Sequence, residues 1–291
     1  MIALAGVAVA VAALAIVVRA TAIDIAPAGR LMAACRGWLG VAVEPASILI
    51  IGFAALATTV FARALVSGVR SIRSTRAYMR TLTPHGTLPG PVRTHVIDDP
   101  TLLAFCAGLL RPRVYVSTGA IHGLDEAELD AVLAHEAHHA ARRDPLRLFV
   151  AQVLAEALFF LPVMKHLHRR YSSLAELAAD DAAVRLGGGS QPLASALLAF
   201  GQADGSPVVG VSAERVDHLL GRHPRAGLPA SLVVGAAVTM SALAGLLLAT
   251  AHLTQMGQIN LSVLLMQSCG PLMIGAPALA LAVGFRRHRS R

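Results

Sequence analysis

Long apolar runs bounded by arginine are the feature that most constrains how this chain of 291 residues can fold. Residues 46–67 are long enough to cross a bilayer as a helix, which rises about 1.5 Å per residue across roughly 30 Å of hydrocarbon. Residues 228–251 and 261–285 are further candidate spans, and residues 1–18 form an unbroken apolar run that Arg19 closes. A signal peptide is the alternative for this first run, but the charged segment that usually begins one is missing. We therefore predict an α-helical integral membrane protein.

The composition agrees with a protein that faces lipid. Charged residues make up 14% of the chain, against about 25% in soluble domains. The net charge of +8 comes almost entirely from arginines beside the apolar runs, and no aromatic-rich basic stripe accompanies them. We expect the lipid bilayer as a partner and no direct binding of nucleic acid. The three cysteines, Cys35, Cys106 and Cys269, are far apart and predict neither a disulfide framework nor a zinc ribbon.

The arginines also predict an orientation. Six of them lie between residues 63 and 93, where there is no acidic residue, and residues 286–291 form a basic tail. Basic segments next to spans stay on the cytoplasmic side, so both segments are expected there. The hypothesis is a multi-pass protein of the cell membrane with four spans and a cytoplasmic catalytic domain. Residues 31–67 fit either one span or a strained pair, and the number of spans before residue 68 stays open.

Three regions are expected. Residues 1–80 form an N-terminal transmembrane region with a basic cytoplasmic segment, residues 81–227 a water-facing domain, and residues 228–291 a helix pair with the basic tail. The middle region is expected to begin with a Pro/Gly-rich linker at residues 83–93. Short strands are predicted at 94–97 and 113–117, with a further strand and a turn at Gly108 between them.

Helices are expected to fill the rest of the middle region. Asp125 and Glu128 have the spacing of a capping box, which predicts a helix from Asp125 to about Arg143, ended by Asp144-Pro145. An apolar helix follows at residues 146–163, and two shorter helices are predicted near 173–186 and 190–200.

Residues 135–139 read His-Glu-Ala-His-His and fit the motif HExxH. Two histidines four residues apart lie on one face of a helix and can reach one Zn²⁺ ion, and Glu136 between them can accept a proton from a zinc-bound water. Glu136 would then deliver that proton to the leaving amine as the general acid. HExxH alone also occurs by chance on polar helix faces, so its context has to support it.

A catalytic zinc site needs a third protein ligand, and the candidate is Glu176. Asp180 lies four residues later, on the same helical face, where it can orient a ligand histidine. Two alternatives stay open. Ser173 and Glu176 also have capping-box spacing, which would explain the glutamate without a metal. Glu156, an acid within an apolar run, is the rival ligand, unless it only pairs with Gln152 one turn before it.

Other polar residues near the motif are given structural roles. We expect His138 to be exposed or to act behind the ligands, and Asp144 to be a helix-end residue rather than a partner of a ligand. His168, Tyr171 and Arg185 are possible helpers in stabilising an oxyanion by their location, but surface roles are expected for them.

The chain from residue 104 to residue 187 resembles the BlaR/MecR antirepressor-type membrane zinc metallopeptidases. The matching pieces are AFCAGLLRPRVYVSTGAI, then the helix around AHEAHH, then LPV before a basic stretch, then LAELAADDAAVRLG. The resemblance implies a cytoplasmic α+β zincin-like (gluzincin) domain. It also implies that His135, His139 and Glu176 bind zinc, that Glu136 is the catalytic acid and base, and that AFCAG is an edge strand for an extended substrate.

The expected function is hydrolysis of peptide bonds in a cytoplasmic or membrane-associated protein, with a transcriptional repressor or another regulator as substrate. Sensing of β-lactams is not expected, because only two spans and the basic tail follow Arg225, where antibiotic-sensing members carry a penicillin-binding domain. An HtpX-like quality-control protease is the first alternative, since such enzymes share HExxH and a downstream ExxxD. A catalytically silent zinc-binding membrane sensor is the second, and the presence of Glu136 argues against it.

Overall fold

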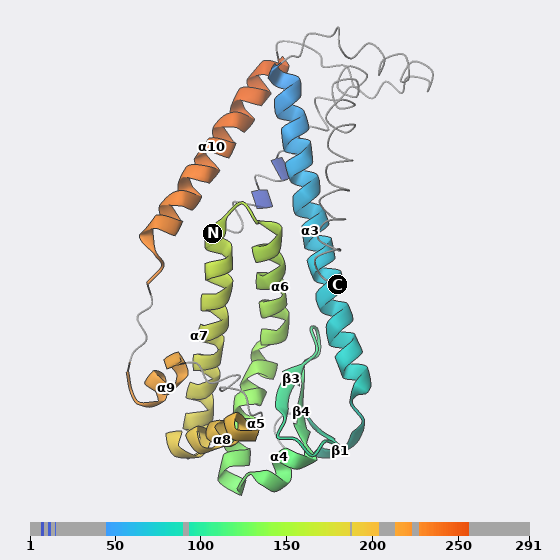
Figure 1. The fold of residues 1–291 in the computed structure, drawn as a ribbon, viewed down its shortest axis with the longest axis vertical. Coiled ribbons are helices and arrows are strands. Elements are labelled where there is room, and N and C mark those ends of the chain that lie inside the picture. The colour runs from blue at the N-terminus through green and yellow to red at the C-terminus, as the bar shows by residue number, and fades with distance from the viewer. Residues whose placement is uncertain are drawn as a thin grey trace, which may run out of the picture. The chain divides into compact units, whose positions relative to one another are not determined.

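The structure is a computed structural model that describes residues 7–8, 11–12, 15, 45–89, 93–186, 188–203, 213–222 and 227–255 (Figure 1). These residues are mostly helical, with one small sheet. The chain divides into two compact units, one of residues Arg63–Val233 and one of Met1–Ala62 with Val234–Arg291. The region boundaries expected at residues 80 and 227 stay a prediction.

Two described helices are long and apolar enough to cross a membrane. They are α3 (Pro45–Thr81), through its stretch Ile48–Thr81, and α10 (Ala230–Gln255), through Ala230–His252. The predicted runs 46–67 and 228–251 fall on them. Helix α3 continues to Thr81 because the segment after its apolar run is rich in arginine, which is a good helix former. In the unit that contains the two chain ends, Phe53 and Leu247 are buried and pack with Leu243.

Several predicted membrane segments lie outside the described residues. They are residues 31–43 and 261–285, the basic tail 286–291, and all but five positions of the run 1–18.

The sheet has the strand order β1-β2-β4-β3. Strands β2 (Thr94–Ile97) and β4 (Arg113–Ser117) are parallel and match the predicted strands. Strand β3 (Ala104–Ala107) pairs antiparallel with β4. Gly108 follows it and forms the predicted turn with a φ of 109°. A side chain at Gly108 would bring a Cβ to 2.7 Å from the carbonyl oxygen of Arg111, so the turn requires glycine.

The expectation of a linker at residues 83–93 is wrong in part, because β1 (Pro84–Leu88) pairs antiparallel with β2. Proline is tolerated as the first residue of an edge strand, where its missing N–H costs no ladder hydrogen bond. The register shifts between Pro84 and Gly86, so His85 is an extra residue of β1 without a partner position on β2, as in a β-bulge.

Helices cover the sheet and form the core of this unit. Helix α4 (Thr118–Gly123) begins directly after β4 and is capped by Ser117, whose hydroxyl accepts a hydrogen bond from the amide of Ala120. Helix α5 (Glu126–Arg142) packs against β3 and β4, and α8 (Ser190–Ala203) packs on α5. A buried cluster joins these elements through residues Val116, Ala120, Leu124, Val132 and Ala196.

A sharp turn after α5 folds the chain back on itself. Arg143 has a left-handed conformation with φ 56°, and α6 (Asp144–Ala157) starts at the next residue with Pro145 in its first turn. Helix α6 has 14 residues, which is too short to span a bilayer. Helices α6 and α7 (Pro162–Leu186) run side by side (Figure 1), and α7 also contacts α5.

The predicted start of the second polar helix near Ser173 is wrong, because α7 begins at Pro162. Proline is favoured in the first turn of a helix, where its missing N–H has no intrahelical partner. The longer helix carries the chain back from the tip of α6 to the side of α5, which places Glu176 near HExxH.

Candidate metal centre

Helix α5 presents the two motif histidines. Its N-terminus has the predicted capping box, in which the Asp125 carboxylate accepts from the Glu128 amide at 2.8 Å and the Glu128 carboxylate accepts from the Asp125 amide at 3.0 Å. His135 and His139 lie one turn apart on the buried face of this helix, with ring centroids 4.8 Å apart. Their Nε2 atoms are 3.2 Å apart, so both rings point the same nitrogen at one location.

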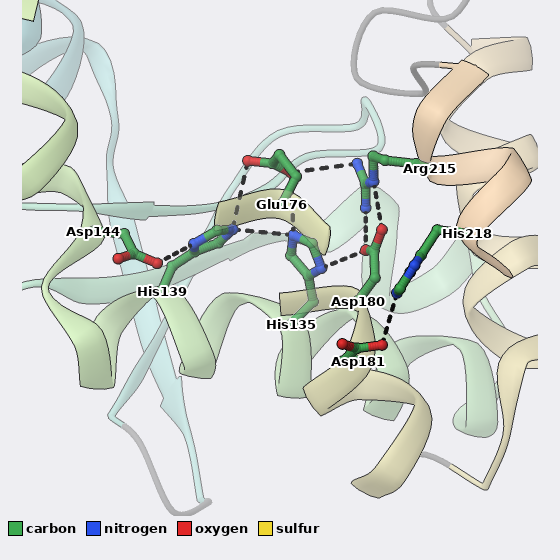
Figure 2. Close-up of polar contacts among 8 residues, drawn as sticks. All are labelled: His135, His139, Asp144, Glu176, Asp180, Asp181, Arg215 and His218. Atoms are coloured by element: carbon green, nitrogen blue, oxygen red, sulfur yellow. Dashed lines mark hydrogen bonds and ion pairs between the residues drawn. The ribbon is translucent and has the colours of Figure 1, made fainter. Parts of the chain in front are cut away.

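Helix α7 brings Glu176 to this location (Figure 2). One carboxylate oxygen lies 3.5 Å from Nε2 of His135 and the other lies 3.6 Å from Nε2 of His139. Among the described residues, these three side chains form the group of histidine, cysteine and acidic residues that could hold a metal ion. The structure thus brings together the three residues that were predicted as ligands.

Neither alternative for the third ligand has support in the structure. Ser173 lies in the interior of α7, and its hydroxyl hydrogen-bonds Glu214 instead of a helix-end amide, so the capping-box interpretation of Glu176 is wrong. The Glu156 carboxylate accepts hydrogen bonds from Arg70 at 2.6 Å and from Gln152 at 3.2 Å. These partners explain an acid on an apolar helix without a metal.

The other ring nitrogen of each histidine, Nδ1, lies close to a carboxylate group. Nδ1 of His135 lies 3.0 Å from Oδ1 of Asp180, and Nδ1 of His139 lies 2.9 Å from Oδ2 of Asp144. Both carboxylates are buried, with side-chain exposures of 0% for Asp180 and 1% for Asp144. Such partners fix the ring orientation and the tautomer, and they leave the Nε2 lone pair free for a metal. Asp144 begins α6, as predicted for a helix-end residue, but the prediction that it has no contact with a candidate ligand is wrong. The turn at Arg143 directs the Asp144 side chain toward His139.

Comparisons with known proteins identify the family of this chain. Residues 32–214, more than half of the chain, match the family model described as BlaR1 peptidase M56. This chain belongs to the M56 peptidase family. The chain is also similar to a protein named Protease HtpX homolog from Acidiphilium cryptum, with 39% identity over 84 residues, or 28% of this chain and 29% of the relative. A protein of the same name from Acaryochloris marina is 37% identical over 90 residues, or 30% of each chain. The match thus spans about three tenths of these curated relatives.

In this member of the M56 peptidase family, Arg215 of α9 (Ala213–Leu219) contacts two carboxylates of α7. Its Nε and Nη2 donate to the two oxygens of Asp180 at 2.8 and 2.5 Å, and its Nη1 lies 3.4 Å from Glu176 (Figure 2). The guanidinium is buried, and its ion pair with Asp180 keeps it charged. Arg215 therefore holds both the third candidate ligand and the carboxylate behind His135, a role that the sequence did not suggest.

Two further residues of α9 contact α7. His218 lies 2.7 Å from the Asp181 carboxylate, and Glu214 accepts hydrogen bonds from Arg170 and Ser173. With Arg215, three residues of α9 thus hold α7, which restricts rotation of the helix that carries Glu176.

Glu136 is half-buried beside the two histidines. Burial raises the pKa of its carboxyl group above the ordinary value, and the nearby His135 and His139 act in the opposite direction. A raised pKa brings a carboxylate closer to the value that suits proton transfer near neutral pH. The position and the electrostatics therefore fit the predicted general base.

Strand β3 is an edge of the sheet, as the segment AFCAG was expected to be. It packs on α5, the helix of the motif. The Cys106 thiol of this strand has its pKa raised to about 12, mainly by burial and further by the negative charges of Glu136 and Asp144. Because β3 packs on α5, the edge strand lies against the helix that carries the candidate general base.

The donor set fits zinc. Two imidazoles and one glutamate are one of the common ligand sets of catalytic zinc sites, and they leave a fourth position open. Ligand atoms bound tetrahedrally at about 2.0–2.1 Å lie roughly 3.3 Å apart. The observed separations of 3.2, 3.5 and 3.6 Å are close to that value.

The remaining candidates have no place among these ligands. His138 is half-buried and its Nε2 atom has no hydrogen-bond partner among the described residues. Tyr171 is half-buried and Arg185 lies near the end of α7. His168 lines a cavity between α3, β3, α6 and α7.

Proposed function

We propose that this chain is a membrane-bound zinc endopeptidase with a zincin-like catalytic domain. The observation that carries the proposal is the convergence of three donors, Nε2 of His135, Nε2 of His139 and the Glu176 carboxylate, with a buried carboxylate behind each histidine. A metal ion needs neutral histidines whose free nitrogens face it, and the two Nδ1 partners provide this arrangement.

Zinc bound there would lower the pKa of a water molecule toward about 7 and polarise the scissile carbonyl. Glu136 accepts the proton of the attacking water as general base and then donates it to the nitrogen of the leaving amine. Asp180 and Asp144 hold the histidine rings, and Arg215 holds Asp180 and Glu176 in place. The open edge of β3 offers backbone N–H and C=O groups to an extended substrate, which would align the scissile bond beside Glu136.

The proposed substrate is a cytoplasmic or membrane-associated protein, with regulatory cleavage of a transcriptional repressor as the first candidate. The match to the BlaR1 peptidase M56 family supports it. The similarity to two proteins named Protease HtpX homolog supports quality control of membrane proteins as the second candidate. Cleavage of a purified repressor, compared with cleavage of an unfolded membrane protein in the same vesicles, separates the two.

The proposed location is the cell membrane, with several spans and the catalytic domain in the cytoplasm. The arginines that follow the apolar part of α3 support this orientation. Helix α6 is too short to cross, which keeps Glu176 and His135 on one side of the membrane. No contact with nucleic acid is proposed.

Metal analysis of the detergent-purified chain tests this proposal. The wild type and Glu156→Ala are expected to hold one zinc ion per chain, and Glu176→Ala is expected to lose it. Loss of zinc only in Glu156→Ala, or its absence from the wild type, would refute the proposed ligand set.

A further inference from the structure

A cavity of about 270 Å³ lies in the unit formed by residues Arg63–Val233. Its walls come from four elements: α3, the end of β3 with the turn that follows it, the start of α6, and α7. Pockets for drug-sized molecules measure about 300–1,000 Å³, and this cavity, just below that range, is large enough for an amino-acid side chain.

Three of its lining residues place the cavity next to the metal centre. Ser172 lies one turn before Glu176 on α7, and Pro145 directly follows Asp144, the partner of His139. Cys106 lies in the edge strand β3, which packs on α5, the helix that carries Glu136. The cavity therefore opens beside the edge strand, within reach of a peptide whose scissile bond lies at Glu136.

The chemistry of the walls defines what the cavity accepts. Its walls include the apolar side chains of Ile72, Leu148 and Phe149 and the uncharged polar side chain of Gln152, and no carboxylate, lysine or arginine of the described residues lines it. A charged side chain would lose hydration there without gaining a partner of opposite charge. One polar group, Nδ1 of His168, is buried and has no hydrogen-bond partner among the described residues, so a neutral side chain with a polar end could also be accommodated.

We propose that this cavity is a specificity pocket, which binds a large uncharged side chain of the substrate within two residues of the cleaved bond. The inference rests on the proposed peptidase function and names its substrate class: segments with a leucine-, methionine- or phenylalanine-sized residue near the cleavage site. Since Ile72 and Thr75 belong to α3, the helix that carries the membrane-spanning stretch also forms one wall of the pocket.

Cleavage of a peptide library by the full chain in detergent tests the pocket, with products read by mass spectrometry. Wild type should favour large apolar residues at one position near the cut and disfavour acidic ones. Thr75→Asp puts a negative charge at the exposed rim of the pocket and should shift that position toward lysine and arginine by about tenfold. Ser74→Asp is the matched control, because Ser74 is exposed on the same helix and does not line the pocket.

A wild type without an apolar preference, or identical cleavage profiles for the two aspartate variants, would overturn the pocket while leaving the peptidase intact. If the wild type holds no zinc and cuts nothing, the proposed function fails instead. The pocket is then tested by equilibrium binding of two fluorescent peptides that differ in one residue, leucine or lysine. Wild type should prefer the leucine peptide, and Thr75→Asp should reverse or abolish that preference; equal binding in both proteins contradicts the inference.

Discussion

Arg215 holds Asp180 through two hydrogen bonds of 2.8 and 2.5 Å, and both side chains are buried. This pair joins α9 to α7 and fixes the carboxylate that contacts His135. The arginine thereby acts on the metal centre from 39 residues beyond Glu176 in the sequence, without being a ligand itself.

Arg215→Ala should lower zinc affinity and peptide cleavage by roughly 10- to 100-fold, because residues that orient metal ligands contribute that much. It also leaves the Asp180 charge buried without its partner, which destabilises the fold. Arg215→Lys should recover part of the affinity, since it restores the charge but not the two-pronged geometry. The measurement is chelator competition, and Arg222→Ala, at an exposed arginine of the same region, serves as the control. Equal affinities in all three variants would exclude a positioning role.

Asp144→Asn should weaken zinc binding by a similar factor of about 10–100. The amide can still contact Nδ1 of His139, but it lacks the charge that increases the basicity of the ring. Asp130→Asn, at an exposed position of α5, should leave zinc affinity unchanged. Titration of both variants with zinc in the presence of a competing chelator compares them, and an unchanged affinity in Asp144→Asn would assign this residue to the helix end alone.

The Arg70–Glu156 ion pair should contribute to stability and not to catalysis. Burial raises the pKa of Glu156, but the hydrogen bond from Gln152 and the charge and hydrogen bond of Arg70 outweigh it and lower the pKa. A lowered folded-state pKa gives stability that is present above the unfolded value of about 4.3 and is lost as the pH falls through the folded value.

Arg70→Gln should therefore lower the free energy of unfolding by about 0.5–1 kcal/mol between pH 5 and 8. The expected effect is small because the Arg70 side chain is about two-thirds exposed and solvent partly screens the ion pair. The difference from wild type should shrink below about pH 4. Urea unfolding at several pH values measures it, with zinc content expected to stay at the wild-type level. A difference that grows on acidification would contradict the assignment.

Cys106 should react slowly with alkylating reagents, because only the thiolate reacts and its pKa is raised to about 12. In a Cys35→Ser/Cys269→Ser background, alkylation at pH 8 should be on the order of 10³-fold slower than that of a free cysteine. The rate should still rise about tenfold per pH unit between pH 9 and 11, whereas that of an ordinary thiol of pKa about 8.5 levels off near pH 10. Mass spectrometry of quenched samples follows the reaction, and a plateau near pH 10 would show that the thiol is not buried beside Glu136 and Asp144.

The parts of the site that depend on one helix could be predicted from the sequence. The spacing of His135 and His139, the capping box of Asp125 and Glu128, and the position of Asp180 one turn after Glu176 all follow from helical geometry. The strands 94–97 and 113–117 could also be predicted, because short β-branched and aromatic runs between turns favour extended structure.

Features that depend on tertiary contacts could not be predicted in the same way. Asp144 reaches His139 because Arg143 adopts a left-handed conformation, which is uncommon for a residue other than glycine. Arg215 meets Asp180 only after α9 has folded onto α7, and no local pattern marks it. The start of α7 and the strand β1 were missed because proline was interpreted as a boundary, whereas Pro162 begins a helix and Pro84 begins an edge strand.

The central claim is that a metal held by His135, His139 and Glu176 acts together with Glu136 to cut peptide bonds. The most direct test compares wild type and Glu136→Gln for zinc content and for peptide cleavage in the same detergent preparation. We predict an equal zinc content in both proteins and a loss of cleavage of at least about 10²-fold in the variant, since glutamine cannot accept the proton of the attacking water. Full cleavage by Glu136→Gln would contradict the account.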